Sequence, residues 1–255
     1  MSLDPLYLQL IVGALIGLGA GYVGSFMILR KMSLVGDALS HVALPGIALA
    51  FLLHINPFIG AFAALFVATL GIWALEKRTE LPSETLVGIF FTSSLALGLL
   101  LTPQPELLEA LFGDISKITA ADLWITAALT VVIIAIMARI SKAVMLGIIS
   151  KDLSRSMRIP LGKMNFLFLF LVSIIVALGL KVAGTLLMGS LVIIPAAAAK
   201  NISANLSNYN KLGGFFGALS AVVGIFISNY YGLQPGPIVV LSGGIIFLAT
   251  LLFKK

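Results

Sequence analysis

Long apolar segments dominate this chain and limit what it can fold into. Each is about as long as a helix must be to cross the roughly 30 Å hydrocarbon core of a bilayer. The nine predicted spans are 6–29, 33–53, 57–75, 85–102, 121–139, 164–180, 183–199, 211–231 and 237–253. Of the 255 residues, 60% are hydrophobic and only 10% are charged, whereas about a quarter of a soluble domain is charged. The sequence therefore predicts an all-α, polytopic membrane bundle of about nine transmembrane helices, with residues 1–255 forming a single transmembrane domain.

The distribution of lysine and arginine predicts the orientation of these spans. Positive charges gather in the cytoplasmic loops of membrane proteins. With the amino terminus outside, 14 of the 16 Lys and Arg residues fall on the cytoplasmic side, and only Lys117 and Lys181 fall outside. We therefore expect the amino terminus outside, the carboxyl terminus in the cytoplasm, and a first span that is retained because no basic segment precedes it.

Two ionisable residues interrupt the second predicted span, in the stretch RKMSLVGDALSHVALPGIALAFLLH from Arg30 to His54. An ionisable side chain inside a span costs free energy, at least about 3 kcal/mol, and marks a functional site by default. Asp37 and His41 are four residues apart, so they project from the same face of a helix. Both side chains are good ligands for a transition-metal ion. The pair therefore predicts a metal path through a membrane.

One chain supplies only half of a metal site at this position. A divalent ion needs about four ligands, and a homodimer with this helix near its twofold axis would offer two carboxylates and two imidazoles. Pro45 and Gly46, one turn later, would loosen the backbone. Alternatively, Asp37 can pair with a lysine or cap the second helix, and His41 can hydrogen-bond to a neighbouring helix. His54, at the outer end of the span, is a weaker ligand candidate and fits an interfacial position better.

Two loops are candidates for partner contacts. The outward loop 102–122 is acidic, and Leu107, Leu108, Leu111 and Phe112 have the spacing of a short interfacial helix. We expect this loop to close the outer end of the bundle, and docking of a cation-delivering protein is the alternative.

The inward loop SKDLSRSMRIP, from Ser150 to Pro160, is the most charged stretch of the chain. Leu153, Met157 and Pro160 can lie along one side of a short helix. Such a helix can dock into a partner's groove, and simple anchoring by positive charge at the cytoplasmic surface is the alternative.

Glycines in the first span, Gly13, Gly17 and Gly21, recur at intervals of four. This spacing lets another helix approach closely in lipid. We expect that helix to lie in the same subunit, and a contact between two copies is the alternative.

Missing motifs exclude several enzymatic functions. The sequence has no GxxxxGK[ST] loop and therefore no nucleotide-binding P-loop of that type. It has two histidines and no HExxH motif, so the ligand set of an intramembrane zinc protease is lacking. It has no cysteine and no GxSxG elbow, which excludes a thiol nucleophile and that serine nucleophile. We therefore expect a transport, channel or signalling protein rather than an enzyme.

Four stretches resemble one family over nearly the whole chain. MSLVGDALSHVALPGIALAFLL, with Asp37 and His41, resembles the second-helix signature of the membrane permeases of ABC importers for zinc, manganese and iron, of the ZnuB/MntB/TroC type. LLEALFGDI resembles the family's segment before the mid-chain outward loop. KVAGTLLMGSLVIIPAAAAK resembles its helix that ends in a proline followed by small residues, and QPGPIVVL resembles the start of its last span.

The resemblance implies a homodimer with its pore at the dimer interface, in a prokaryotic plasma or inner membrane, with a fold similar to the vitamin B12 and siderophore importer permeases. Two cytoplasmic ATP-binding subunits would hydrolyse ATP, and an extracytoplasmic metal-binding protein would deliver Zn²⁺, Mn²⁺ or Fe²⁺. No cofactor would be bound permanently. Asp37 and His41 match the family's intramembrane metal pair. The ATPase-coupling helix would comprise Lys151, Asp152, Leu153, Ser154, Arg155, Ser156, Met157, Arg158, Ile159 and Pro160.

The sequence thus favours the permease subunit of an ATP-driven importer that carries divalent transition metal inward by alternating access. A permease for a metal chelate, such as a siderophore or cobalamin, would need a wider pathway without charged ligands at a constriction. A stand-alone secondary cation carrier would use Asp37 and His41 as a proton relay and would need no ATPase. A regulatory or scaffold membrane protein would give no reason for the pair.

Overall fold

The regular structure of the described residues is helical throughout. A computed structural model describes residues 4–79, 81–102 and 110–253. The helices are α1 (Pro5–Leu29), α2 (Val35–Val42), α3 (Leu44–Leu52), α4 (Pro57–Arg78), α5 (Ser83–Leu101), the 3₁₀ turn η1 (Ile115–Lys117), α7 (Ala120–Ile149), α8 (Lys151–Ser156), α9 (Leu161–Ile202), α10 (Leu206–Tyr231) and α11 (Pro235–Leu251).

The predicted spans are confirmed in number and order, although several boundaries were wrong. Within the described part of the chain, seven helices are long and apolar enough to cross a membrane, and two shorter apolar helices, Leu187–Ile202 and Pro235–Leu251, bring the apolar segments to the nine expected. The span predicted at 121–139 continues as α7 to Ile149, because the helix persists past its first basic residues, and α10 starts before the predicted residue 211.

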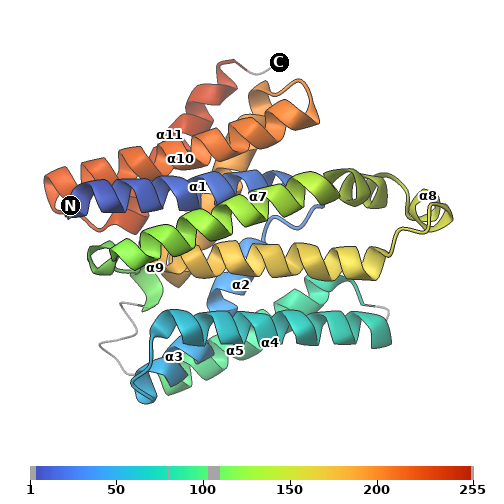
Figure 1. The fold of residues 1–255 in the computed structure, drawn as a ribbon, viewed down its shortest axis with the longest axis horizontal. Coiled ribbons are helices and arrows are strands. Elements are labelled where there is room, and N and C mark those ends of the chain that lie inside the picture. Colours follow the sequence, from blue (N-terminus) through green and yellow to red (C-terminus); the bar gives the residue numbers. More distant parts are fainter. Residues whose placement is uncertain (1–3, 80, 103–109, 254–255) are drawn as a thin grey trace.

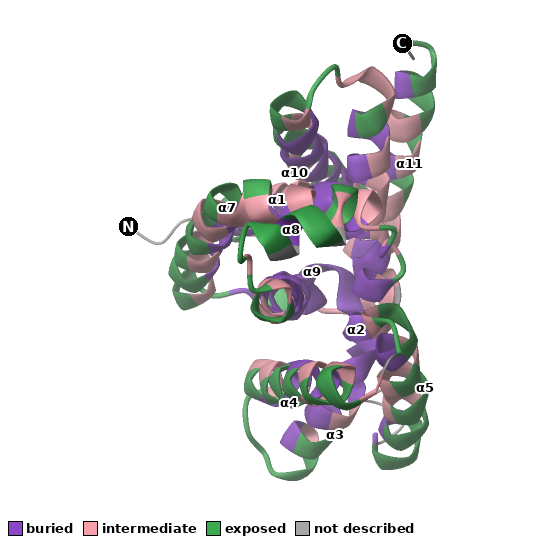
Figure 2. Ribbon diagram, turned by 90° about the vertical axis from the view of Figure 1, so that its right-hand side faces the viewer, coloured by how far each residue is buried: buried purple, intermediate pink, exposed green. Residues whose placement is uncertain are grey.

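The helices form three groups. Figure 1 shows α10 and α11 along one side, α1, α7 and the first part of α9 in the middle, and α3, α4 and α5 along the other side. The short helix α2 links the middle group to the third, and it packs mainly on α9 and α5. Figure 2 shows many buried residues on α2, α9 and α10, and about half of α1 is buried as well. The core therefore surrounds α9, which contacts most of the other helices.

Glycines allow α1 and α10 to pack with their backbones in contact. A Cβ atom at Gly21 would lie 2.0 Å from the carbonyl oxygen of Gly213, and one at Gly17 would lie 2.2 Å from the carbonyl oxygen of Gly217. No side chain fits in that space, so the glycine spacing of the first span serves packing within one subunit, as expected.

The second span and helix α9 are each interrupted by a break in regular helical geometry. The second span is divided at Ala43 into α2 and α3. Helix α9 is bent at Gly184, whose φ of 66° and ψ of −177° lie outside the helical region. The two spans predicted at 164–180 and 183–199 are therefore two apolar helices, Leu161–Thr185 and Leu187–Ile202, that meet at this kink without a loop between them. Pro195, further along α9, does not interrupt it.

Candidate metal site

The least buried side of α2 carries Asp37. Within this helix only Asp37 and Ala38 are half-buried, and every other residue is buried. Asp37 is the third residue of α2, and the turn before this helix is mixed, with Met32 7% exposed and Leu34 67% exposed. His41 lies one helical turn further along, is 9% exposed, and interacts electrostatically with Asp37. The two predicted ligands are therefore brought together on one helix face, with Asp37 the more accessible.

The surroundings of His41 leave one ring nitrogen without a hydrogen bond. Its Nδ1 atom is buried and has no hydrogen-bond partner among the residues that the structure describes. The ring of Phe91, on α5, lies with its centroid 5.4 Å from the imidazole centroid at an angle of 54°. An unpartnered polar atom in an apolar contact costs free energy, and no described residue offsets that cost at this nitrogen.

Helix α9 fixes the backbone of α2 beside Asp37. A Cβ atom at Gly189 would lie 2.5 Å from the Cβ atom of Asp37 and 2.7 Å from its Cα atom. The hydroxyl of Ser40 is 2.6 Å from the carbonyl oxygen of Thr185 and 2.7 Å from the carbonyl oxygen of Asp37. Ser40, Thr185 and Gly189 were not among the predicted site residues. A buried serine in an apolar stretch was the only signal that could have found the first of them.

Pro45 causes the break after α2, and Gly46 packs against a neighbouring helix. Pro45 has no N–H to donate to the carbonyl of His41, so the helix cannot continue regularly through this turn. Gly46 packs against α4 instead of simply loosening the chain, because a Cβ atom at Gly46 would lie 2.1 Å from the carbonyl oxygen of Gly60.

His54 lies apart from the pair. It is exposed in the turn between α3 and α4, with a φ of 54° in the left-handed region. The nine-residue helix α3, about 14 Å long, lies between it and His41. In the described residues, no group of three or more His, Cys, Asp or Glu side chains is placed to hold a metal ion. One chain therefore offers the two ligands Asp37 and His41, a set that fits half of a four-ligand site.

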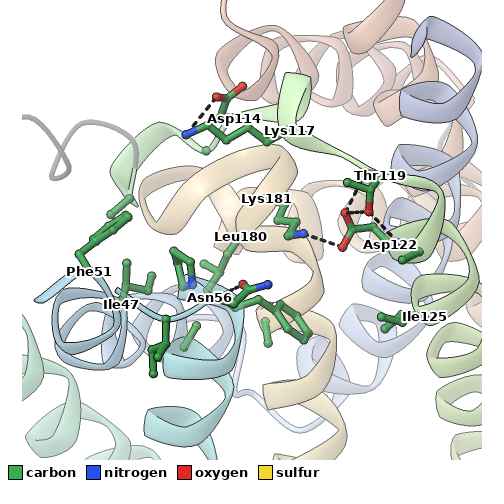
Figure 3. Close-up of a pocket in the computed structure, with 18 residues that line it drawn as sticks. Ile47, Phe51, Asn56, Asp114, Lys117, Thr119, Asp122, Ile125, Leu180 and Lys181 are labelled. Carbon is green, nitrogen blue, oxygen red and sulfur yellow. Dashed lines mark hydrogen bonds and ion pairs between the residues drawn. The ribbon is translucent and has the colours of Figure 1, made fainter. Parts of the chain in front are cut away.

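A cavity of about 620 Å³ opens at the end of the bundle that carries Lys181 and Asp122. Figure 3 shows its lining from α3, α4, α7 and α9, with Asp114 and Lys117 at its edge. Lys181 Nζ on α9 is 2.6 Å from Asp122 Oδ1 on α7, and Asp114 pairs with Lys117 at 3.6 Å. The carboxylates that line this cavity are thus already paired with lysines.

The outer loop is only partly described. Ala110, Leu111 and Phe112 are helical, and η1 follows, but Glu106, Leu107, Leu108 and Glu109 lie outside the described residues. The predicted interfacial helix is therefore seen at its last two predicted positions. Burial alone would raise the pKa of Asp114, but hydrogen bonds from the hydroxyl and backbone N–H of Ser116, with the Lys117 charge, lower this pKa below its ordinary value.

A short helix occupies the inward loop. Directly before α8, the hydroxyl of Ser150 accepts a hydrogen bond from the backbone N–H of Leu153 at 3.1 Å, and in the turn after α8 Arg158 has a φ of 56°. Leu153 is 46% exposed and Met157 is 57% exposed. Figure 1 shows α8 projecting from one end of the bundle. Two apolar side chains four residues apart are thus presented outside the core.

A polar cluster at the same end was missed by the sequence analysis. The amide nitrogen of Asn165 lies 2.7 Å from both carboxylate oxygens of Glu76 and 2.7 Å from the hydroxyl of Ser83. The guanidinium of Arg30 donates to the amide oxygen of Asn165. Burial lowers the pKa of Arg30, and the nearby Glu76 charge opposes that shift. The cluster joins the end of α1, α4, α5 and the start of α9.

The chain resembles characterised metal permeases along its whole length. It is 31% identical over 257 residues to the manganese transport system membrane protein MntC of Listeria monocytogenes, covering 99% of this chain and 92% of that protein. It is 34% identical to the manganese import system permease protein ScaB of Streptococcus gordonii, covering 94% and 88%. It is 30% identical to the high-affinity zinc uptake system membrane protein ZnuB of Haemophilus influenzae, covering 99% and 98%.

Solved structures agree with these relatives. The structure of PsaBC from Streptococcus pneumoniae in complex with Fab matches 98% of this chain and 91% of that chain, with a TM-score of 0.85 and 32% identity. An inward-facing metal-chelate type ABC transporter has the same fold, with a TM-score of 0.81 at 15% identity. The model of the ABC 3 transport family matches residues 3–254. This chain therefore belongs to the ABC 3 transport family.

Proposed function

We propose that this chain is the membrane-spanning permease subunit of an ATP-driven importer for divalent transition metal ions. Asp37 and His41 would coordinate the ion transiently on its way inward, while alternating access is driven by ATP hydrolysis on partner subunits. The observation that carries this proposal is the accessible carboxylate beside an imidazole whose Nδ1 has no hydrogen-bond partner in the described residues, inside an otherwise apolar span. Relatives named for manganese and zinc uptake support the choice of substrate class.

A dimer would complete the site. Two ligands from each of two copies would give Zn²⁺ the four it prefers, and Mn²⁺ or Fe²⁺ would add water or carbonyl oxygens. The set is modest, as transport requires, because an ion that is held too tightly does not leave. It also tolerates several metals, so the supply of metal would decide which ion is carried.

The partners would sit at opposite ends of the bundle. Leu153 and Met157 on the exposed side of α8 and its following turn would enter a groove on a cytoplasmic ATP-binding subunit, with one such subunit for each permease copy. An extracytoplasmic metal-binding protein would dock at the end with Lys181 and Asp122. This arrangement places the amino terminus outside and the carboxyl terminus in the cytoplasm, in agreement with the excess of basic residues in the inward-facing connections.

Metal uptake by cells tests the ligand pair directly. Asp37→Ala and His41→Ala should each abolish accumulation of Mn²⁺ or Zn²⁺, with normal amounts of the protein in the membrane. His54→Asn is the matched control, because it removes the other histidine at an exposed left-handed position that asparagine tolerates. This control should transport normally. Normal uptake by both the Asp37 and His41 variants would overturn the proposal.

Co-purification separates the importer from a secondary carrier. An importer of this class should be isolated with a P-loop ATPase bound, and Leu153→Asp with Met157→Asp should release that subunit while the permease stays in the membrane. A secondary carrier would be isolated alone, and its transport would follow the proton gradient instead of ATP. A chelate permease would transport the chelate in preference to the free ion.

A further inference from the structure

The hydroxyl of Ser40 joins α2 to α9 directly beside the ligand pair. It lies 2.6 Å from the carbonyl oxygen of Thr185 and 2.7 Å from the carbonyl oxygen of Asp37. Ser40 and Thr185 are both completely buried. A serine hydroxyl has one proton and therefore shares it between these two carbonyls. It thus connects the backbone of Asp37 to α9 at a position between the two ligands.

The bonded carbonyl belongs to the residue that follows the kink. Gly184 has the left-handed φ of 66°, and Thr185 is the first residue after it. One turn later, Gly189 packs on the Cα and Cβ atoms of Asp37 with no room for a side chain. The hydrogen bond from Ser40 to Thr185 and the close packing of Gly189 against Asp37 therefore fix the position of Asp37 relative to α9.

The outer loop holds the kink in place. A Cβ atom at Gly184 would lie 2.2 Å from the carbonyl oxygen of Leu111, and one at Gly113 would lie 2.8 Å from the carbonyl oxygen of Leu180 and from the backbone nitrogen of Gly184. The loop backbone thus fits into the bend of α9. A change in the bend at Gly184 would be carried through Thr185 and Ser40 to the ligand pair.

We propose that Ser40 is a positioning residue for Asp37 and His41, setting the geometry in which they hold the metal ion. The inference rests on the proposed function of the pair. Groups that orient metal ligands without touching the metal typically change metal affinity by about 10–100-fold when they are removed. Ser40 occupies that place here, because its hydroxyl contacts the backbone of one ligand and precedes the other by one residue.

A binding experiment with a matched serine control tests this role. Thr69 and Ser173 form another hydroxyl contact between α9 and a neighbouring helix, at 2.8 Å and likewise buried, but on the part of α9 that precedes the kink. The complex of permease with its ATPase subunits is purified without the binding protein, and ⁶⁵Zn²⁺ binding is measured by equilibrium dialysis. Ser40→Ala should weaken binding by about tenfold, whereas Ser173→Ala should bind like the wild type, with both variants at wild-type abundance.

The outcomes separate this inference from the proposed function. Unchanged zinc binding in Asp37→Ala would overturn the proposed function itself. Loss of binding in Asp37→Ala together with wild-type binding in Ser40→Ala would overturn only the positioning role. Equal weakening in Ser40→Ala and Ser173→Ala would also overturn it, because a general loosening of α9 would then explain the result.

A second variant covers the case in which Ser40→Ala fails to accumulate. Ser40→Cys keeps nearly the same shape and replaces the hydroxyl by the weaker S–H donor. Its affinity for Mn²⁺, an ion that prefers oxygen ligands to a thiolate, should fall below that of the wild type while its melting temperature stays close to it. Wild-type affinity in Ser40→Cys would overturn the positioning role.

Discussion

Two glycine-dependent helix contacts in this molecule have different compositions. Between α1 and α10, Gly17 and Gly21 meet Gly217 and Gly213, and the contact is backbone against backbone along two long helices. Between α2 and α9, a single glycine, Gly189, faces the ionisable Asp37, and a hydroxyl bond lies beside it.

The difference separates a contact built for rigidity from a contact built around ionisable groups. The α1–α10 contact gains its stability from close van der Waals packing, which holds apolar helices together in lipid. The α2–α9 contact accepts costly polar groups, a short helix of eight residues and a kink in its partner. We infer that the first contact is a scaffold and the second is the functional contact. The following predictions test that division.

The largest effect is expected at the scaffold. Gly21→Ala places a methyl group 2.0 Å from the carbonyl oxygen of Gly213, so the two long helices must separate. The free energy of unfolding should fall by at least about 3 kcal/mol, the upper range of overpacking costs, and little folded permease should reach the membrane. Gly244→Ala is the control, because a Cβ atom there meets nothing within 4 Å. Normal amounts of a stable Gly21→Ala protein would refute the scaffold interpretation.

At the functional contact, transport should suffer more than stability. Gly189→Ala puts its methyl group 2.5 Å from the Asp37 Cβ atom, and the short helix α2 can shift to relieve the clash. Metal uptake should fall by roughly 10–100-fold through displacement of the ligand, while membrane abundance stays within about twofold of wild type. Gly88→Ala, on the open face of α5, should leave uptake unchanged. A Gly189→Ala protein with full uptake would contradict the division.

The polar cluster at the start of α9 should behave as scaffold despite its charges. Asn165→Ala removes the amide that bonds to Glu76, Ser83 and Arg30, so each of these partly buried groups loses one partner, while the bond from the Ser83 hydroxyl to Glu76 remains. The free energy of unfolding should drop by about 1–3 kcal/mol, measured by thermal melting in detergent. Zinc affinity should not change, and Asn208→Ala, at an exposed position, should affect neither property. A change in zinc affinity would link this cluster to the ion path.

The smallest effect is expected at the exposed outer loop. The pKa of Asp114 is lowered in the folded protein, so its ionised form contributes stability above the ordinary carboxylate range. That contribution is lost as the pH falls through the lowered pKa. Asp114→Asn should therefore lower the melting temperature slightly at pH 7, because the free energy of unfolding falls by less than about 1 kcal/mol. The difference should shrink as the pH is taken below about 4. A difference in melting temperature between wild type and Asp114→Asn that grows as the pH falls would contradict the stabilising role of the ionised Asp114.

The sequence was sufficient for the number of spans and for placing Asp37 and His41 together on one helix face. Hydropathy marks membrane helices because every apolar segment of that length must be buried in lipid or in the core. Asp37 and His41 were conspicuous because charge is costly in such a segment. The glycine spacing of α1 was equally informative, since four-residue intervals place glycines on one face.

The kink at Gly184 and the contact of Ser40 with α9 could not be predicted from hydropathy or residue spacing. Gly184 is one of 25 glycines, and its conformation depends on the backbone of Leu111 and Gly113, more than 70 residues earlier in the chain. Ser40 resembles any other small residue in a helix until the carbonyl of Thr185 is placed beside it. Periodicity reports on one helix at a time, whereas these features arise from contacts between distant segments.

The mutual fit of Gly113 and Gly184 also guides where this protein can be labelled. Any reporter group, epitope or cysteine placed at either glycine would push the loop out of the bend, so a spectroscopic probe there would record its own disturbance. Gly232, in the turn between α10 and α11, has the same left-handed φ, but a Cβ atom added there would meet nothing within 4 Å. A tag inserted at that turn would leave the bend intact, and distance measurements from it could follow α9 during turnover.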